Sequence, residues 1–186
     1  MILTNAVKHF ITITKHKLIV FKLCCKAGEP WRGFMHDWSK YSPTEFWESA
    51  KYYNGKYSPI HACRRLNGYS KAWLHHKGRN KHHHEYWYDY NTEQKTPIMP
   101  YKYAVEMICD TLAAGMTYQK DNWTNDYQLN YYLKARKKAK INPKIDAILL
   151  EVYEMISEQG IDEVINSKTL KKIYKSHVGD INDKKN

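Results

Sequence analysis

The sequence predicts an all-α fold. Apolar residues recur at helical spacing along most of the 186 residues, and no apolar–polar alternation or hairpin turn indicates a strand. Proline also follows a good N-cap residue at three places, which is typical of the first position of a helix. These helix starts are Ser42-Pro43, Ser58-Pro59 and Asn142-Pro143.

Three helices are expected before the histidine-rich middle of the chain. The first covers residues 3–26 and is amphipathic, because lysines and histidines interrupt its apolar stretch. The second begins at Ser42, and Glu45 three residues later completes the pattern of a capping box. The third begins at Ser58, and Gly68 is expected to interrupt it.

Four further helices are expected in the second half of the chain. Each starts near a proline or a capping residue and shows helical apolar spacing. They cover residues 99–118, 125–140, 142–160 and 161–176. The expected organisation is therefore one helical domain over residues 1–140, C-terminal helices over 141–178 packed on that domain, and a flexible tail over 179–186.

Composition narrows the classes of partner. The formal net charge is +11, which favours anionic partners such as phosphate esters, nucleotides or nucleic acid. The basic runs at residues 77–81 and 134–140 are equally typical of a solvated helix face. No apolar run is long enough to span a membrane, and the N-terminal stretch lacks a signal-peptide cleavage site. Four cysteines without a CxxC pair suit a reducing cytoplasm. We therefore expect a cytoplasmic protein without a membrane partner.

Histidines and carboxylates form the candidate site. Five of the ten histidines lie within residues 75–84. Outside that stretch, the candidate metal ligands are His16, the adjacent pair His36 and Asp37, and Asp110. Neutral imidazole and carboxylate suit a divalent transition metal such as Mn, Fe, Zn or Ni, with two ions conceivable. The two members of an adjacent pair can face one ion only at a helix end or bend.

The order of these residues resembles the HD superfamily of metal-dependent phosphohydrolases, which is named for its His-Asp doublet. The resemblance implies an HD-domain-like helical bundle over residues 1–140, with extra C-terminal helices. It also implies a metal site built by His16, His36, Asp37 and Asp110. The segment HDWSK is similar to the HDxGK segment of the HD-GYP branch, which uses additional histidines to hold two metals. The GYP element is absent here, so that branch's cyclic-dinucleotide substrate is not implied.

A closer resemblance is to a family of phage and bacterial proteins known only as a domain of unknown function. Its pattern reads HDxSK, then HHxxxNxHHxEYW, then EMxxD. This chain matches the pattern at residues 36–40, 75–87 and 106–110. The family has no activity to transfer, so the resemblance identifies candidate residues and leaves the reaction open.

The two resemblances assign roles to the candidate residues. Asp37 and Lys40 are the expected catalytic residues, and Glu106 is expected to orient a ligating histidine. We favour His76 and His83 as ligands of a second metal, although His75 and His82 are open as replacements or as substrate contacts. The other candidates for binding the substrate phosphate are Lys40, Lys77, Arg79 and Asn80. His61 is expected at the surface, and His84 is not expected to bind metal. Core packing is favoured over substrate stacking for Trp38, Trp47, Trp73, Tyr86 and Trp87.

The sequence is compatible with three functions. The favoured one is a metal-dependent phosphohydrolase that acts on a nucleotide or another phosphate ester. The alternative is a basic protein that binds nucleic acid or another partner and holds a structural metal. A third is an enzyme on the HD scaffold with oxygen-dependent di-iron chemistry. Dependence on added metal would distinguish the enzymes from the binding protein, whose affinity would instead fall steeply with salt.

Overall fold

The computed structural model describes residues 2–180, and these residues form helices and no strand. The predicted all-α fold is confirmed. Short 3₁₀ turns lie at Trp38–Tyr41 (η1), His84–Trp87 (η2), Lys120–Asn122 (η3) and Arg136–Lys138 (η4). The α-helices are α1 (Ile2–Lys26), α2 (Pro30–Met35), α3 (Pro43–Tyr52), α4 (Pro59–Asn67), α5 (Lys71–Lys77), α6 (Tyr101–Gln119), α7 (Tyr127–Ala135), α8 (Pro143–Gln159), α9 (Ile161–Val164) and α10 (Ser167–Val178).

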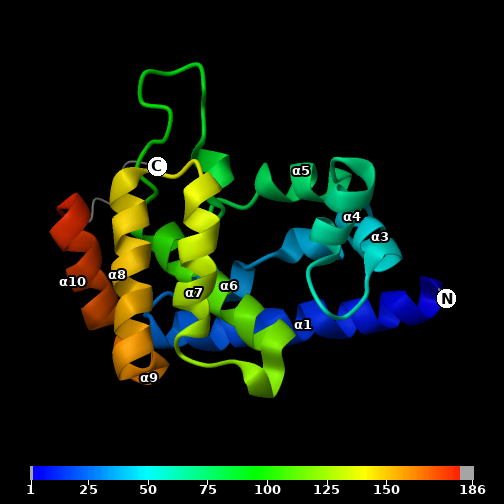
Figure 1. The fold of residues 1–186 in the computed structure, drawn as a ribbon, viewed down its shortest axis with the longest axis horizontal. Coiled ribbons are helices and arrows are strands. Elements are labelled where there is room, and N and C mark those ends of the chain that lie inside the picture. The colour runs from blue at the N-terminus through cyan, green and yellow to red at the C-terminus, as the bar shows by residue number, and fades with distance from the viewer. Residues whose placement is uncertain (1, 181–186) are drawn as a thin grey trace.

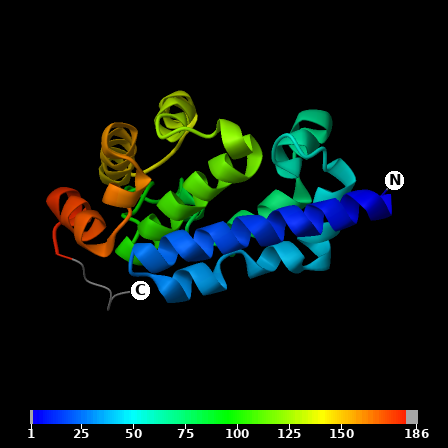
Figure 2. The same cartoon turned by 90° about the horizontal axis from the view of Figure 1, so that it is seen from below.

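The long helix α1 forms one side of the molecule, and the other helices are arranged on it in two groups (Figure 1). Helices α3, α4 and α5 gather over its N-terminal half, whereas α7, α8 and α10 gather toward its C-terminal end. Helix α6 lies between the groups and contacts α1, and α2 runs beside α1 (Figure 2). The centre of the molecule is therefore bounded by α1, α5 and α6.

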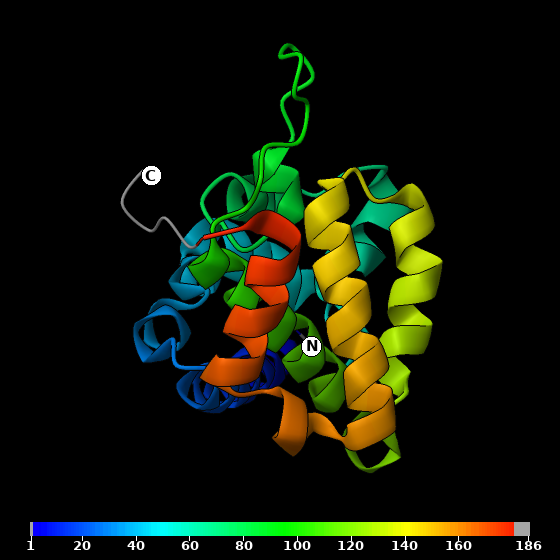
Figure 3. The same ribbon diagram turned by 90° about the vertical axis from the view of Figure 1, so that its left-hand side faces the viewer.

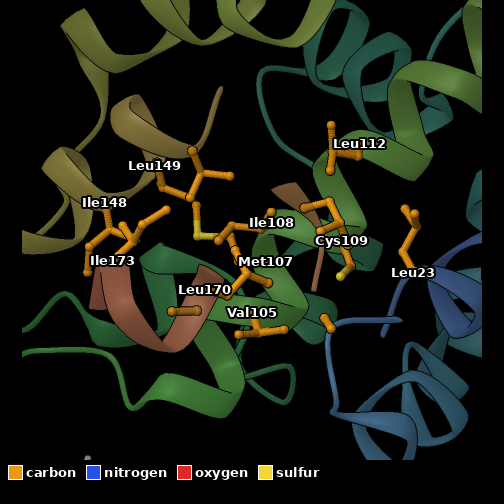
Figure 4. Packing of buried hydrophobic residues seen from close by; sticks show 14 of the residues in the cluster. Leu23, Val105, Met107, Ile108, Cys109, Leu112, Ile148, Leu149, Leu170 and Ile173 are labelled. Atoms are coloured by element: carbon orange, nitrogen blue, oxygen red, sulfur yellow. The ribbon is translucent and has the colours of Figure 1, made fainter. Parts of the chain in front are cut away.

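The hydrophobic core surrounds α6. Ile108 and Leu112 of α6 belong to one buried cluster with Leu149 of α8 and Ile173 of α10 on one side and Leu23 of α1 on the other (Figure 4). Helix α6 is buried over most of its circumference, and its apolar residues are therefore not confined to one face. Helices α7 and α8 stand side by side, and α10 packs on α8 (Figure 3). The C-terminal helices therefore share one core with α1 and α6.

Helix α3 begins where the sequence indicated, but the predicted capping box is wrong, because the Ser42 side chain makes no cap hydrogen bond. Ser42 is the N-cap residue and Pro43 is the first helical residue, yet the Ser42 hydroxyl is buried without a hydrogen-bond partner. The carboxylate of Glu45 contacts His75 and His76 instead. Hydrogen bonds to an ionised carboxylate from two imidazoles are stronger than the single bond that a backbone cap would provide.

One expected helix ends earlier than the sequence indicated, and another is divided in two. Helix α7 ends at Ala135 and passes into the turn Arg136–Lys138, so the basic run 134–140 is not one helical face. The expected helix over 161–176 is divided into α9 and α10, because Asn166 accepts a hydrogen bond from the backbone N–H of Thr169 and starts a new helix. Gly68 ends α4 as expected, with φ of 77°. In the expected tail, residues 181–186 lie outside the described residues.

Some aromatic residues expected in the core lie at the surface. Trp38 is 51% exposed and Trp47 is 55% exposed, so core packing was wrong for both, and Tyr86 is exposed as well. Trp73 and Trp87 are partly buried. Among residues 2–180, no helix combines the length and the apolar character that crossing a membrane requires.

Replacement of Gly33 by alanine is expected to destabilise the fold. A Cβ atom at Gly33 would lie 2.8 Å from the Cβ of Cys24 and 2.9 Å from the Cα of Phe21, so α2 would have to move away from α1. Overpacking of this kind costs about 1–3 kcal/mol. Urea unfolding should show a lower midpoint for Gly33→Ala, whereas Met35→Ala, at a partly exposed position of the same helix, should change it little. An unchanged midpoint for Gly33→Ala would contradict this close approach.

Candidate metal centre

Four predicted ligands from three separate elements meet in one group. His16 comes from α1, His36 and Asp37 follow α2, and Asp110 comes from α6. One ligand atom from each lies within 4.8 Å of those of the others. The Nε2 atom of His16 is 2.9 Å from Asp110 Oδ1, and Nε2 of His36 is 3.3 Å from the same oxygen. We call these four residues the first ligand group.

A backbone bend turns the adjacent pair toward one point. Helix α2 ends at Met35, His36 has φ of −56° and ψ of 127°, and Asp37 has φ of 53°. The left-handed region is uncommon for residues other than glycine, although Asp adopts it more readily than most. As a result, Nε2 of His36 lies 3.1 Å from Oδ2 of Asp37. The bend therefore resolves how neighbouring residues can face a single site.

The histidine-rich stretch supplies a second ligand group on the other side of Asp37. This group consists of Asp37, His76, His82 and His83, and their ligand atoms also lie within 4.8 Å of one another. The Oδ1 atom of Asp37 is 3.3 Å from His76 Nε2 and 3.5 Å from His82 Nε2. His76 Nε2 is 2.9 Å from His83 Nε2. Asp37 thus directs Oδ2 toward the first group and Oδ1 toward the second.

The carboxylate of Asp37 suits a metal cation. Both of its oxygens are buried: Oδ2 lies beside the ammonium of Lys40 and Nε2 of His36, and Oδ1 lies beside Nε2 of His76 and of His82. Burial alone would raise the pKa of Asp37, but His36 and Lys40 lower it well below its usual range, so the group is ionised. Burial, together with His82 and His76, lowers the pKa of His83 well below its usual value. A buried anion requires compensation, and neutral imidazoles beside carboxylate oxygens are suitable donors for a divalent transition metal.

Glu106 holds two of the histidines from outside the ligand groups. Nδ1 of His36 donates to Oε1 of Glu106 at 3.0 Å, and Nδ1 of His82 lies 3.1 Å from the same oxygen. Arg32 donates to the other carboxylate oxygen at 2.7 Å. Burial would raise the pKa of Glu106, but His36 and His82 lower it to about 2. Because Glu106 accepts from Nδ1 of His36 and lies beside Nδ1 of His82, the Nε2 atoms of both rings are left to face Asp37.

Glu45 plays a corresponding role that the sequence did not reveal. Its Oε2 accepts a hydrogen bond from Nδ1 of His76 at 2.7 Å, and its Oε1 accepts one from Nδ1 of His75 at 2.7 Å. Glu45 therefore directs Nε2 of His76 toward Asp37. His75 belongs to neither ligand group. The capping-box pattern concealed this role, because the same spacing from Ser42 explained Glu45 locally.

The predicted phosphate-binding residues lie in two different places. Lys40 borders a cavity beside the two ligand groups, and its Nζ is 2.5 Å from Oδ2 of Asp37. The other candidates, Lys77, Arg79 and Asn80, do not line that cavity. Arg79 is exposed, and Asn80 donates to the hydroxyl of Ser39 at 2.9 Å. His61 is exposed, as expected.

Replacement of Glu45 by glutamine is expected to weaken metal binding by about 10- to 100-fold, the usual effect of losing an outer partner of a ligating histidine. Metal titration followed by calorimetry would measure this. Glu48→Gln is a matched control on the same helix, because Glu48 accepts from the backbone N–H of Ala72 and contacts neither ligand group. Equal metal affinities for Glu45→Gln and the unaltered protein would contradict the positioning role.

Comparison with known proteins identifies a family but no function. No curated protein and no solved structure matches the chain significantly. The model of one family, described as a family of unknown function (DUF5662), matches residues 5–155. The match covers both ligand groups, Glu45 and Glu106, and it ends within α8. Since it covers most of the 186 residues, the chain belongs to the DUF5662 family.

Proposed function

We propose that this protein is a metal-dependent phosphohydrolase with two divalent ions bridged by Asp37. One observation carries the proposal. The two oxygens of one buried carboxylate, only one of which pairs with an ammonium group, face two separate groups of imidazoles. Two-metal sites of this kind, with ions about 3.5–4 Å apart, are widespread among enzymes that cleave phosphate esters.

The side chains around the proposed ions suit phosphate chemistry. Divalent ions bound there would activate a water molecule and neutralise charge on the phosphoryl oxygens. Lys40 supplies a permanent positive charge: burial would lower its pKa, but Asp37 and Asp110 raise it above its ordinary value. Its ammonium group can therefore donate to a phosphate oxygen at the edge of the cavity. The net charge of +11 favours the approach of an anionic substrate.

A reconstitution assay tests this function. Protein purified without a nickel column would be stripped with chelator, reloaded separately with Mn²⁺, Fe²⁺ or Zn²⁺, and assayed with phenyl phosphate. Turnover should appear only after reloading and should disappear again with chelator. Absence of turnover with every metal would contradict the proposal.

A second candidate function, binding of single-stranded nucleic acid, is favoured by one surface feature. Tyr131, Lys134, Lys137 and Lys138 are all exposed around the end of α7. Aromatic and basic side chains together can bind nucleotide bases and phosphates. Binding through these residues should weaken strongly between 50 and 200 mM salt and should not require metal. Replacement of the three lysines by alanine should abolish such binding and leave phosphoesterase turnover unchanged.

A further inference from the structure

A cavity of about 180 Å³ lies beside the two ligand groups. Its walls come from α1, η1, α3, α5, α6, the start of α4 and the segment that precedes η2. The part of its wall next to the ligand groups consists of four of their members, His16, His76, His83 and Asp110, together with Lys40. A phosphoryl group held at the proposed metal centre would therefore leave the rest of its ester in this cavity.

Apart from Glu45, the remainder of the cavity wall is uncharged, and five of its residues carry hydroxyl groups. The hydroxyl-bearing residues are Thr12, Ser49, Ser58, Thr117 and Tyr118. His9 also lines the cavity; it is 4% exposed, and its Nδ1 has no hydrogen-bond partner. Burial, with a smaller contribution from Lys40, lowers the pKa of His9 to about 4, so its imidazole is neutral near pH 7. A buried ring nitrogen without a partner costs free energy unless a ligand satisfies it.

The charges around the cavity match a single phosphate. Lys40 is its only lysine or arginine among the described residues that line it. Its two carboxylates are already engaged, because Glu45 accepts from His75 and His76, and Asp110 belongs to the first ligand group. A second phosphate would enter a cavity with no cation to pair with it, and a cationic tail would find no free carboxylate.

The cavity also disfavours a nucleoside. Pockets that enclose drug-sized ligands usually have volumes of roughly 300–1,000 Å³, which exceeds the 180 Å³ here. Trp73 and Tyr118 are the cavity's aromatic residues besides histidine, and the larger ring, that of Trp73, has the guanidinium of Arg64 4.4 Å from its centroid. The ring of His83 packs edge-on against Trp73 at 5.0 Å. The Trp73 ring is therefore already engaged by neighbouring side chains.

We propose that the substrate is a small phosphomonoester with an uncharged, hydroxyl-bearing tail, such as a sugar or polyol phosphate, and that His9 recognises the tail. This inference rests on the proposed phosphohydrolase function. The oxygen of water forms a bond to phosphorus while the ester P–O bond breaks. The electron pair of that bond leaves with the tail oxygen, which takes up a proton, so the products are the free alcohol and inorganic phosphate.

The test compares substrates on the metal-loaded protein. The panel contains glycerol phosphate, a pentose phosphate and a hexose phosphate, with phenyl phosphate as a tail without hydroxyl groups and with nucleoside 5′-monophosphates and diphosphates. We expect kcat/KM for the best sugar or polyol phosphate to exceed that of every nucleotide by at least about tenfold. A nucleotide that matches or exceeds it would overturn the substrate class while leaving the phosphohydrolase function intact.

Variants test the role of His9. His9→Phe retains a ring without its polar atoms and should raise KM for the sugar or polyol phosphate roughly tenfold, with little change for phenyl phosphate. His61→Phe, at an exposed position outside the cavity, is the matched control and should change neither. Ser49→Ala provides a second, smaller change in the same wall. Equal effects of His9→Phe on both substrates would overturn the recognition role. Absence of turnover of every ester, phenyl phosphate included, would overturn the proposed function and this inference together.

Discussion

Replacement of Asp37 by asparagine is expected to remove both metal binding and hydrolysis. The substitution preserves the size of the side chain but removes the negative charge of the residue that belongs to both ligand groups. It also leaves the ammonium of Lys40 without its nearest carboxylate oxygen. Because both proposed ions depend on this bridge, turnover should fall to background in a single step.

Thermal unfolding would measure the loss of metal binding independently of activity. An ion present at 100 times its dissociation constant stabilises the folded state by about 2.7 kcal/mol, so metal should raise the Tm of the unaltered protein and not that of Asp37→Asn. Asp146→Asn is a suitable control, since Asp146 accepts from Tyr132 and Arg136 and belongs to neither ligand group. That control should lower Tm but keep the response to metal. A full metal-induced shift in Asp37→Asn would contradict the bridging role.

Replacement of Lys40 by methionine is expected to lower turnover by about 100- to 1,000-fold, the usual effect of removing one donor that stabilises charge in the transition state. Metal content should be retained, because Lys40 provides no ligand atom and its loss removes positive charge close to Asp37. Steady-state kinetics at matched metal content would measure the effect.

Lys77→Met is the matched control for that change. Lys77 ends α5 and does not line the cavity, so its loss should alter turnover little. Wild-type turnover in Lys40→Met, or an equal loss in both variants, would show that Lys40 does not act on the substrate phosphate.

The sequence predicted which residues meet, but not how each one is oriented. The doublet His36-Asp37 and the paired histidines were visible as patterns, and the structure brings them together with His16 and Asp110. The choice among paired histidines could not be made, because residues 78–83 lie between α5 and η2 and have no helical period to assign faces. His75 and His76 are neighbours at the end of α5 and both donate to Glu45, and only the approach of His76 to Asp37 distinguishes them.

Helix starts were predicted better than helix ends and surface positions. Proline after a capping residue fixes a start through local geometry, which is why α3, α4 and α8 begin as expected. The break between α9 and α10 depends on one Asn166 cap within an otherwise continuous apolar pattern. The exposure of Trp38 could not be predicted, because Trp38 lies in a four-residue 3₁₀ turn. Such a turn is too short for apolar periodicity to indicate a buried face.

Elemental analysis of protein purified without a nickel column tests the binuclear centre most directly. We expect about two divalent ions per chain, with iron distinguishing a di-iron centre from a Zn or Mn centre. The same preparation of Asp37→Asn should contain no bound divalent ion. Absence of bound metal from the unaltered protein, both as purified and after reconstitution, would contradict the account and leave nucleic-acid binding as the better explanation.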